Sequence, residues 1–312
     1  MKVGTLPVVV SLAVTPLLLV RSAAAPGFSA WSDPVHLDPP INTTFNETAP
    51  SLSKDGLALY FSSSRPCGEG DTVVDLNIWV AHRATKVAPW ETPECLRINV
   101  NDFEDSAAAF SRDGHWMFFV SDRPGGVGTP GPGNGRDLWV AWRSHVHDDQ
   151  AWNDPINAGP AINSAMADAG PSYFENETGE WPQLFFTSNR NGTFDLWVSD
   201  VFGNGQFGAP ERIAELSTDT NVEARPSIRH DGLEIFFFRG PAPFDIYAAT
   251  RSDPAAAWSQ PVNLGAPINT AGGEQQAAIA SDRETLVFAS DRTGSLGALD
   301  IWMSTRSKER KP

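Results

Sequence analysis

Residues 258–270 read WSQPVNLGAPINT, and residues 31–43 read WSDPVHLDPPINT, so the chain uses nearly the same phrase close to both of its ends. Nine of the thirteen positions are identical. Self-similarity within one chain indicates a repeated architecture, and the length of the repeat decides which one. The fold therefore depends on the copies that lie between these two phrases.

Two further phrases recur five times. The first combines an Asp-Gly dipeptide with an aromatic run that ends in arginine, as in DSAAAFSRDGHWMFFVSDR at 105–123. The second is short, and its aromatic residue stands at Trp79, Trp139, Trp197, Tyr247 and Trp302, in steps of 60, 58, 50 and 55 residues. Asp-Gly between such runs favours tight hairpins, and this period is typical of a four-stranded sheet per repeat. The sequence predicts an all-β, five-bladed β-propeller of four-stranded antiparallel blades.

The opening phrase supplies the fourth strand of each blade. Its copies begin at Trp31, Trp90, Trp152, Phe207 and Trp258. The first copy precedes every hairpin and the last hairpin has no copy after it, so we expect the N-terminal strand near Trp31 to complete the last blade beside Trp302. Such closure pairs the two ends of the chain. The proline in each copy fits an outermost strand, because a missing N–H is tolerated at a sheet edge.

The phrases SxDGxxLYFSSxR, SDRPGG, DLWVAxR and WxxPxNLGxxIN resemble the WD40-like repeat known as PD40, which occurs in exported bacterial proteins and in the propeller of TolB. The resemblance covers residues 28–306 and recurs five times in register. It implies an exported bacterial propeller. Two repeats depart from it, with ENETGEW in place of the third Asp-Gly turn and Asp282-Arg283-Glu284 in place of the fifth.

The N-terminus and the charge predict an exported protein. Residues 1–25 hold a lysine, an apolar run and a small-residue site, which is typical of a secretion signal. We expect residues 26–306 to form one propeller domain and 307–312 a short basic tail, with no membrane span after signal cleavage, a periplasmic or extracellular location and a monomeric state. Removal of Lys2 and Arg21 takes the formal net charge from -15 to -17 (-15 - 2). That charge argues against nucleic acid as a partner.

The two cysteines and a histidine pair are the next candidates. Cys67 and Cys95 form an even pair that fits an oxidising compartment, and we expect a disulfide between them. The spacing of His145 and His147 would put both imidazoles on one side of a strand, as a metal clip. Isolated histidine pairs are more often solvated, so this is the weaker candidate. No nucleophile-elbow, zincin or phosphate-loop motif occurs in the sequence.

An acidic residue stands at the start of every inner strand, where we expect it to lie near the mouth of the central channel. These candidates are Glu47, Glu104, Asp105, Asp168, Glu223 and Glu274. They could form a catalytic or cation-binding site, or each could accept hydrogen bonds from the backbone of the next blade. The structural interpretation is favoured because every repeat has such a residue, whereas catalysis needs asymmetry. No cofactor is required, although two or three of these acids sharing an ion would make a structural calcium site.

Charged residues also mark the ends of the second and third strands. An arginine ends each second strand and an acidic or amide residue begins each third, which predicts an Arg–Asp pair within each blade. The predicted pairs are Arg65 with Asn77, Arg123 with Asp137, Arg190 with Asp195, Arg239 with Asp245, and Arg292 with Asp300.

The preferred functional hypothesis is a binding or scaffold module for a protein or a cell-envelope glycan. Its binding face would carry the acidic residues and the long loops 65–76 and 123–137 of the first two repeats. The alternative is a carbohydrate-active enzyme, a glycoside hydrolase or lyase, that uses a pair of inner-strand carboxylates. Fold alone does not decide between them.

Overall fold

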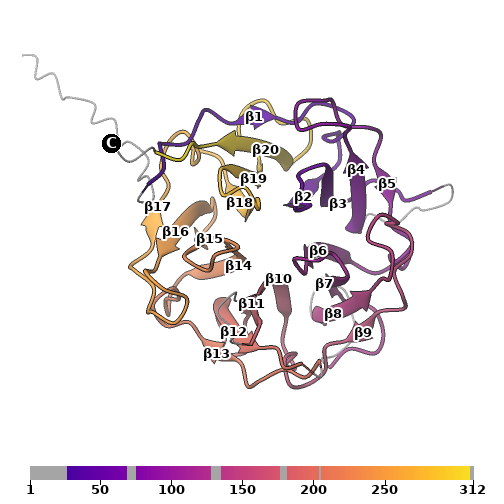
Figure 1. Ribbon diagram of the computed structural model, residues 1–312, viewed down its shortest axis with the longest axis vertical. Helices are drawn as coiled ribbons and strands as arrows, with labels where there is room; N and C mark the ends of the chain where they lie inside the picture. The colour runs from indigo at the N-terminus through magenta and orange to yellow at the C-terminus, as the bar shows by residue number, and fades with distance from the viewer. Residues whose placement is uncertain (1–26, 69–74, 128–134, 176–180, 204, 310–312) are drawn as a thin grey trace, which may run out of the picture.

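The chain folds into a ring of five small β-sheets around a central channel (Figure 1). The computed structural model describes residues 27–68, 75–127, 135–175, 181–203 and 205–309. Each sheet has four antiparallel strands, and no helix occurs within these residues, so none of them forms a helix that could cross a membrane. The five-bladed β-propeller predicted from the repeats is confirmed.

In every blade the first strand lies against the channel and the two-residue fourth strand lies at the rim (Figure 1). Blade 1 contains β2 (Glu47–Leu52), β3 (Ala58–Ser63), β4 (Asn77–His82) and β5 (Glu94–Cys95). Blade 2 contains β6 (Asp105–Phe110), β7 (Trp116–Ser121), β8 (Asp137–Trp142) and β9 (Ile156–Asn157). Blade 3 contains β10 (Asp168–Phe174), β11 (Gln183–Ser188), β12 (Asp195–Asp200) and β13 (Glu211–Arg212). Blade 4 contains β14 (Val222–Ile228), β15 (Glu234–Gly240), β16 (Asp245–Thr250) and β17 (Val262–Asn263).

Blade 5 closes the ring as predicted. Its strands are β18 (Glu274–Ile279), β19 (Thr285–Ser290), β20 (Asp300–Thr305) and, from the other end of the chain, β1 (Val35–His36). His36 pairs with Trp302, and the side chain of Asn42 bonds both the N–H and the carbonyl of Ile301. Lys308, in the segment predicted as a tail, forms a further bridge with Phe28.

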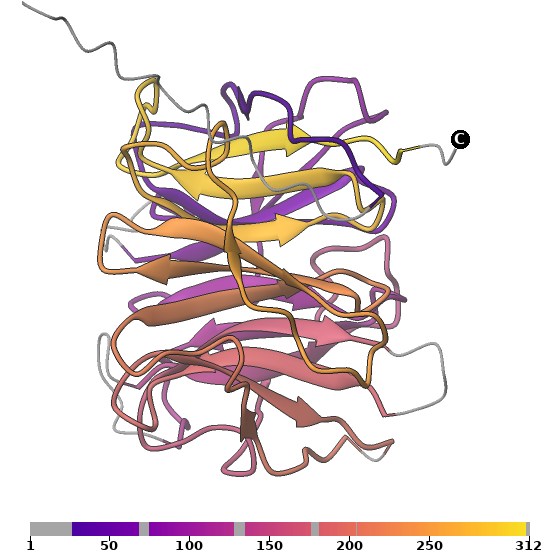
Figure 2. The same ribbon diagram turned by 90° about the vertical axis from the view of Figure 1, so that its left-hand side faces the viewer.

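The strands run between two faces of the ring, as the side view shows (Figure 2). We call the face where the inner strands begin, at Glu47 and its equivalents, the acid-ring face. The opposite face, where the first and second strands are joined by tight turns such as 53–57, is the turn face. Gly56 adopts a φ of 73°, which glycine reaches at no steric cost, and Arg283 takes the same conformation in blade 5 with a φ of 68°.

A β-bulge interrupts every inner strand, and the residue two positions after the acid near the start of the strand adopts a positive φ. The residues are Ala49, Ala107, Gly170, Arg225 and Gln276. Apart from Gly170 these residues would ordinarily avoid that conformation, so the bulge is imposed by the fold. Because all five lie at the same level, they form a narrow ring in the channel, which we call the neck.

The core lies between neighbouring blades. Ile78 and Val80 of blade 1 pack against Met117 and Phe119 of blade 2, and the other junctions hold equivalent aromatic and aliphatic clusters. Aromatic runs of the second strands supply most of the fully buried bulk. The blades are thereby fixed relative to one another, and the channel has rigid walls.

Candidate functional site

The acids that begin the inner strands are buried. Glu47, Asp105, Asp168, Glu223 and Glu274 each have 0% of their surface exposed. The two oxygens of Glu47 accept hydrogen bonds from the N–H and hydroxyl of Thr43, the hydroxyl of Ser63 and the guanidinium of Arg65, at 2.8–2.9 Å. Equivalent bonds from the preceding linker recur in the other blades. These carboxylates lock each linker to its blade, and none of them lines the pockets described below.

Glu104 lies outside this ring. Its side chain is 12% exposed, pairs with Arg136 at 2.6 Å and accepts a hydrogen bond from Ser106. The structure therefore does not bring Glu104 and Asp105 together as an acid and base pair, because Asp105 bonds instead to Arg123 and to the N–H of Val100.

The predicted pairing of the second-strand arginines with the third-strand acids is wrong. Each arginine pairs with the first-strand acid of its blade, as Arg123 does with Asp105 at 2.5 Å. Ser121 pairs with Asp105 on one neighbouring strand and with Asp137 on the other. Both acids therefore lie next to the end of the second strand, and the sequence does not show which of them the arginine contacts. The guanidinium of Arg123 lies over Phe119 and Trp139 and bonds the linker carbonyl of Ile98, which directs it to the first strand.

The third-strand acids bond to the fourth strand instead. Asp137 accepts a hydrogen bond from Asn157 at 2.8 Å, and three blades have an equivalent bond. These are Asp245 with Asn263, Asp195 with Arg212, and Asp300 with His36. In blade 1, Asn77 bonds to Asp75.

The remaining sequence candidates lie apart from one another. Cys67 and Cys95 form a disulfide that ties the loop after β3 to β5, with Cα atoms 5.5 Å apart. His145 and His147 lie in the loop after β8 rather than on a strand, and His147 is the one that lines the turn-face cavity described below. Within the described residues, no three acidic, histidine or cysteine side chains are grouped to hold a metal. Loop residues 69–74 and 128–134, part of the predicted binding face, lie outside the described residues.

The turn face holds the main cavity, with a volume of about 870 Å³. The turns that line it are held by a second set of arginines. Arg143 lies over the ring of Trp152 and donates a hydrogen bond to the carbonyl of Gly114 at 3.0 Å. Arg83, Arg251 and Arg306 make the same two contacts in blades 1, 4 and 5. The turns are thus fixed before any ligand binds.

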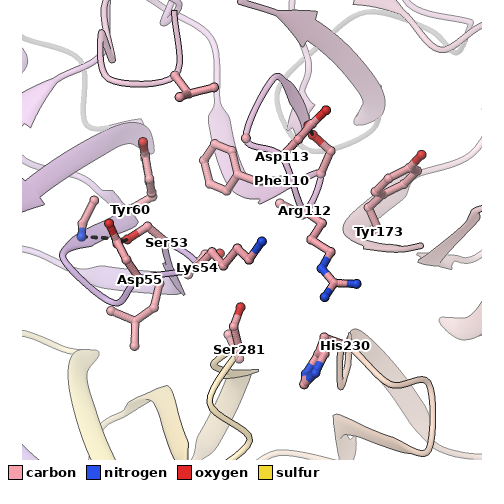
Figure 3. Close-up of a pocket in the computed structure, with 18 of the residues that line it drawn as sticks. Ser53, Lys54, Asp55, Tyr60, Phe110, Arg112, Asp113, Tyr173, His230 and Ser281 are labelled. Carbon is pink, nitrogen blue, oxygen red and sulfur yellow. Dashed lines mark hydrogen bonds between the residues drawn. The ribbon is translucent and has the colours of Figure 1, made fainter. Parts of the chain in front are cut away.

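One position of the repeat supplies a different side chain to this pocket from every blade. It precedes the Asp-Gly of the turn in blades 1, 2 and 4 and is the equivalent residue in blades 3 and 5. It is occupied by Lys54, Arg112, Glu175, His230 and Ser281. Figure 3 shows Lys54, Arg112, His230 and Ser281 pointing toward a common centre. The rings of Phe110 and Tyr173 line the same cavity. Sequence reasoning missed these residues because it looked for what the repeats share, whereas this position holds a different residue in each of the five repeats.

An arm of the pocket extends toward the rim between blades 1 and 2. Asp149 accepts hydrogen bonds there from the hydroxyl of Tyr60, from Arg143 at 2.6 Å and from His82 at 2.8 Å. Burial raises the pKa of Tyr60, and the charge of Asp149 adds to the rise, so the hydroxyl remains a donor. His147 lines this arm.

The carboxylates of the turns accept hydrogen bonds from backbone and side-chain groups of the same turn. Asp55 accepts hydrogen bonds from the Ser53 hydroxyl and the Leu57 N–H, and these lower its pKa. Burial raises the pKa of Asp113, but hydrogen bonds from Ser111 and His115 outweigh it and the pKa lies below its ordinary value. The five side chains of the variable turn position comprise Lys54, Arg112 and His230, one acid, Glu175, and the neutral Ser281.

Comparisons with known proteins show the fold alone. No family model and no curated protein sequence matches the chain. Among solved structures, BT0996 in an RGII complex aligns with a TM-score of 0.61 at 12% identity, over 89% of this chain and 92% of that one. The GH43 endo-arabinanase from Bacillus licheniformis aligns with a TM-score of 0.56 at 14% identity, over 84% and 95%. A TolB-like protein from Agrobacterium tumefaciens gives a TM-score of 0.45 at 15% identity, over 80% of this chain and 71% of that one. The neighbours are β-propellers, and membership of the PD40 family stays a prediction.

Proposed function

We propose that this protein is an exported, monomeric module that binds a glycan in the pocket of the turn face. The observation that supports this proposal is that one position of the repeat places five different side chains around one cavity. The acid ring has a carboxylate in every blade, whereas this position holds a different side chain in every blade and lines a cavity, which favours a role in ligand recognition. The pocket accordingly replaces the acid-ring face in the functional hypothesis.

A sugar fits the chemistry of this lining. Sugar hydroxyls pair with charged and hydroxyl side chains such as Lys54 and Ser281, while the C–H faces of a sugar ring pack on aromatic rings such as Phe110 and Tyr173. The cavity of about 870 Å³ has the size of a small-molecule site. The similarity to glycoside hydrolase propellers is compatible with this assignment but concerns the fold.

A thermal-shift screen of residues 26–312 against neutral and acidic oligosaccharides tests the proposal. A sugar at 100 times its Kd should stabilise the protein by about 2.7 kcal/mol, which raises the Tm by roughly 5 to 10 °C for a domain of this size. Ala109→Trp fills the wall of the pocket and should remove the shift. Phe45→Ala, a change on the acid-ring face, should keep it. The reverse pattern would return the site to the acid-ring face.

A carbohydrate-active enzyme, either a hydrolase or a lyase, is the second candidate, and Glu175 is the observation that favours it. Burial raises the pKa of Glu175, and the charge of Asp113 adds to the rise. The pKa of Asp113 itself is lowered. Two carboxyl groups with pKa values moved apart are what acid and base catalysis requires. Glu175→Gln should then abolish release of reducing sugar while sugar binding persists; unchanged release would remove this candidate.

A further inference from the structure

Two exposed tryptophans lie side by side at the turn-face end of blade 2. Trp116 begins β7 and Trp142 ends β8, and the two residues are paired in the strand register. Their ring centroids lie 6.5 Å apart, and the residues are 44% and 39% exposed. The ring of His115 lies nearly parallel to that of Trp142, with centroids 6.2 Å apart, and donates a hydrogen bond from Nδ1 to the carbonyl oxygen of Arg143 at 2.7 Å. We call these three rings the aromatic platform.

The fold does not require tryptophan at these two positions. The other blades have smaller or polar pairs at the same register: Ala58 with His82, Gln183 with Asp200, Glu234 with Thr250, and Thr285 with Thr305. All five blades nevertheless form the same four-stranded sheet. Because two large apolar rings in water forgo the free energy of burial, the pair points to an occupant of the platform.

The platform is continuous with the wall of the pocket. The backbone N–H of Trp116 donates a hydrogen bond to the hydroxyl of Ser111 at 3.0 Å, and Ser111 lines the pocket. Alternate residues of a strand share a face, so Trp116 lies on the same face of blade 2 as Phe118. The ring of Phe118 stacks on that of Tyr173 in blade 3, with centroids 4.8 Å apart, and Tyr173 also lines the pocket. Because β8 lies outside β7 in the blade, a ligand that leaves the pocket past Tyr173 meets Trp116 first and Trp142 next.

The area of the platform fits sugar rings better than a protein. At up to about 250 Å² for a whole tryptophan side chain, the exposed fractions of the pair leave about 200 Å² open. A stable protein interface buries about 800 Å² on each partner. The C–H face of a sugar ring packs on an aromatic ring, and the indole N–H can donate to a sugar hydroxyl.

We propose that the ligand is a polysaccharide chain that runs out of the turn-face pocket on the side of blade 2 that faces blade 3, with sugar rings packed on Trp116 and Trp142. This inference rests on the proposed glycan-binding function and adds a second subsite to the same site. The pocket holds a short stretch of the chain, and the platform holds the sugars that follow it. Affinity should therefore rise once the chain is long enough to reach the platform.

The test is calorimetric titration with trimers and hexamers of glucan, xylan, arabinan and galacturonan. For at least one polymer, the hexamer should bind ten-fold or more tightly than the trimer, which corresponds to about 1.4 kcal/mol. The double change Trp116→Thr with Trp142→Thr copies the threonine pair of blade 5. It should lower the affinity for the hexamer to that for the trimer and leave binding of the trimer unchanged.

Trp181→Thr is the matched control. It removes a tryptophan of blade 3 that is 53% exposed, packs edge-on against Phe202 and does not line the pocket. Binding of both sugar lengths should stay as in the parent protein. Ala109→Trp, which fills the pocket wall, should remove binding of both lengths.

Each other outcome overturns a defined part of the proposal. A hexamer that binds no more tightly than the trimer, or equally well to the threonine double variant, would overturn the platform and leave glycan binding in the pocket intact. An equal loss with Trp181→Thr would overturn the assignment to blade 2. Hexamer binding that survives Ala109→Trp would overturn the extension from the pocket, and failure of every sugar to bind would overturn both proposals. Thermal unfolding checks each variant, and the single change Trp142→Ala gives the answer if the double variant fails to fold.

Discussion

Changing Glu47 to glutamine distinguishes an architectural acid ring from a functional one. Glu47 is fully buried, and its Oε1 accepts bonds from Thr43, Ser63 and Arg65 while its Oε2 accepts one from the Thr43 N–H. Glutamine keeps one acceptor oxygen, so either its amide faces a donor or Arg65 loses its counter-charge. Removing one partner of a buried ion pair costs about 3 kcal/mol or more.

That loss should lower the Tm by roughly 6 to 10 °C, measured by calorimetry, with sugar binding unchanged below the transition. Glu94→Gln, the same change at an exposed site of β5, should shift stability by less than about 0.5 kcal/mol. Adding Arg65→Gln to Glu47→Gln should cost less than the sum of the two single changes. An unchanged Tm together with lost binding or turnover would refute the architectural role and restore the acid ring as a site.

Two further outcomes follow from local contacts. Replacing Cys67 and Cys95 by serine should cost about 3.6 kcal/mol for a loop of 28 residues, seen in urea unfolding, and unreduced protein should show no alkylatable thiol; two reactive thiols would contradict the bond. Asp55→Asn should lower stability at pH 7 by about 1 kcal/mol or less. Because the folded-state pKa of Asp55 lies below its ordinary 3.8, its contribution is full above that pH and is lost as the pH falls through the lower value, so the difference between the variant and the parent should shrink as the pH falls below 3.8 and vanish below the folded-state pKa. A difference that persists there would reject the hydrogen-bonding role of the carboxylate.

The repeats predicted the fold because the repeated phrases carry the periodicity of strands and the chemistry of turns. Closure at Trp31 and Trp302 was predictable because the phrase is doubled at the two ends. The bulges left no such trace, since Ala49, Arg225 and Gln276 share a backbone conformation and no side-chain property.

The site was not predictable in the same way. A carboxylate that recurs in every repeat looks the same in the sequence whether its side chain lines an open channel or is buried under the linker between blades. The hydrogen bonds from Thr43 and Arg65 to Glu47 show that it is buried under the linker. The partner of Arg123 was ambiguous because Asp105 and Asp137 flank one serine. The pocket depends on a turn position whose residues differ in every blade, so a search for shared motifs passes over it.

The pairing of β1 with β20 also sets an order of events during synthesis. The first strand to leave the ribosome must wait for the last, because the contact between Asn42 and Ile301 spans 259 residues. Until then blade 5 lacks its edge and the ring stays open, and contacts so distant in sequence form slowly. A nascent chain therefore has no closed channel and no complete pocket until nearly all of it has been made.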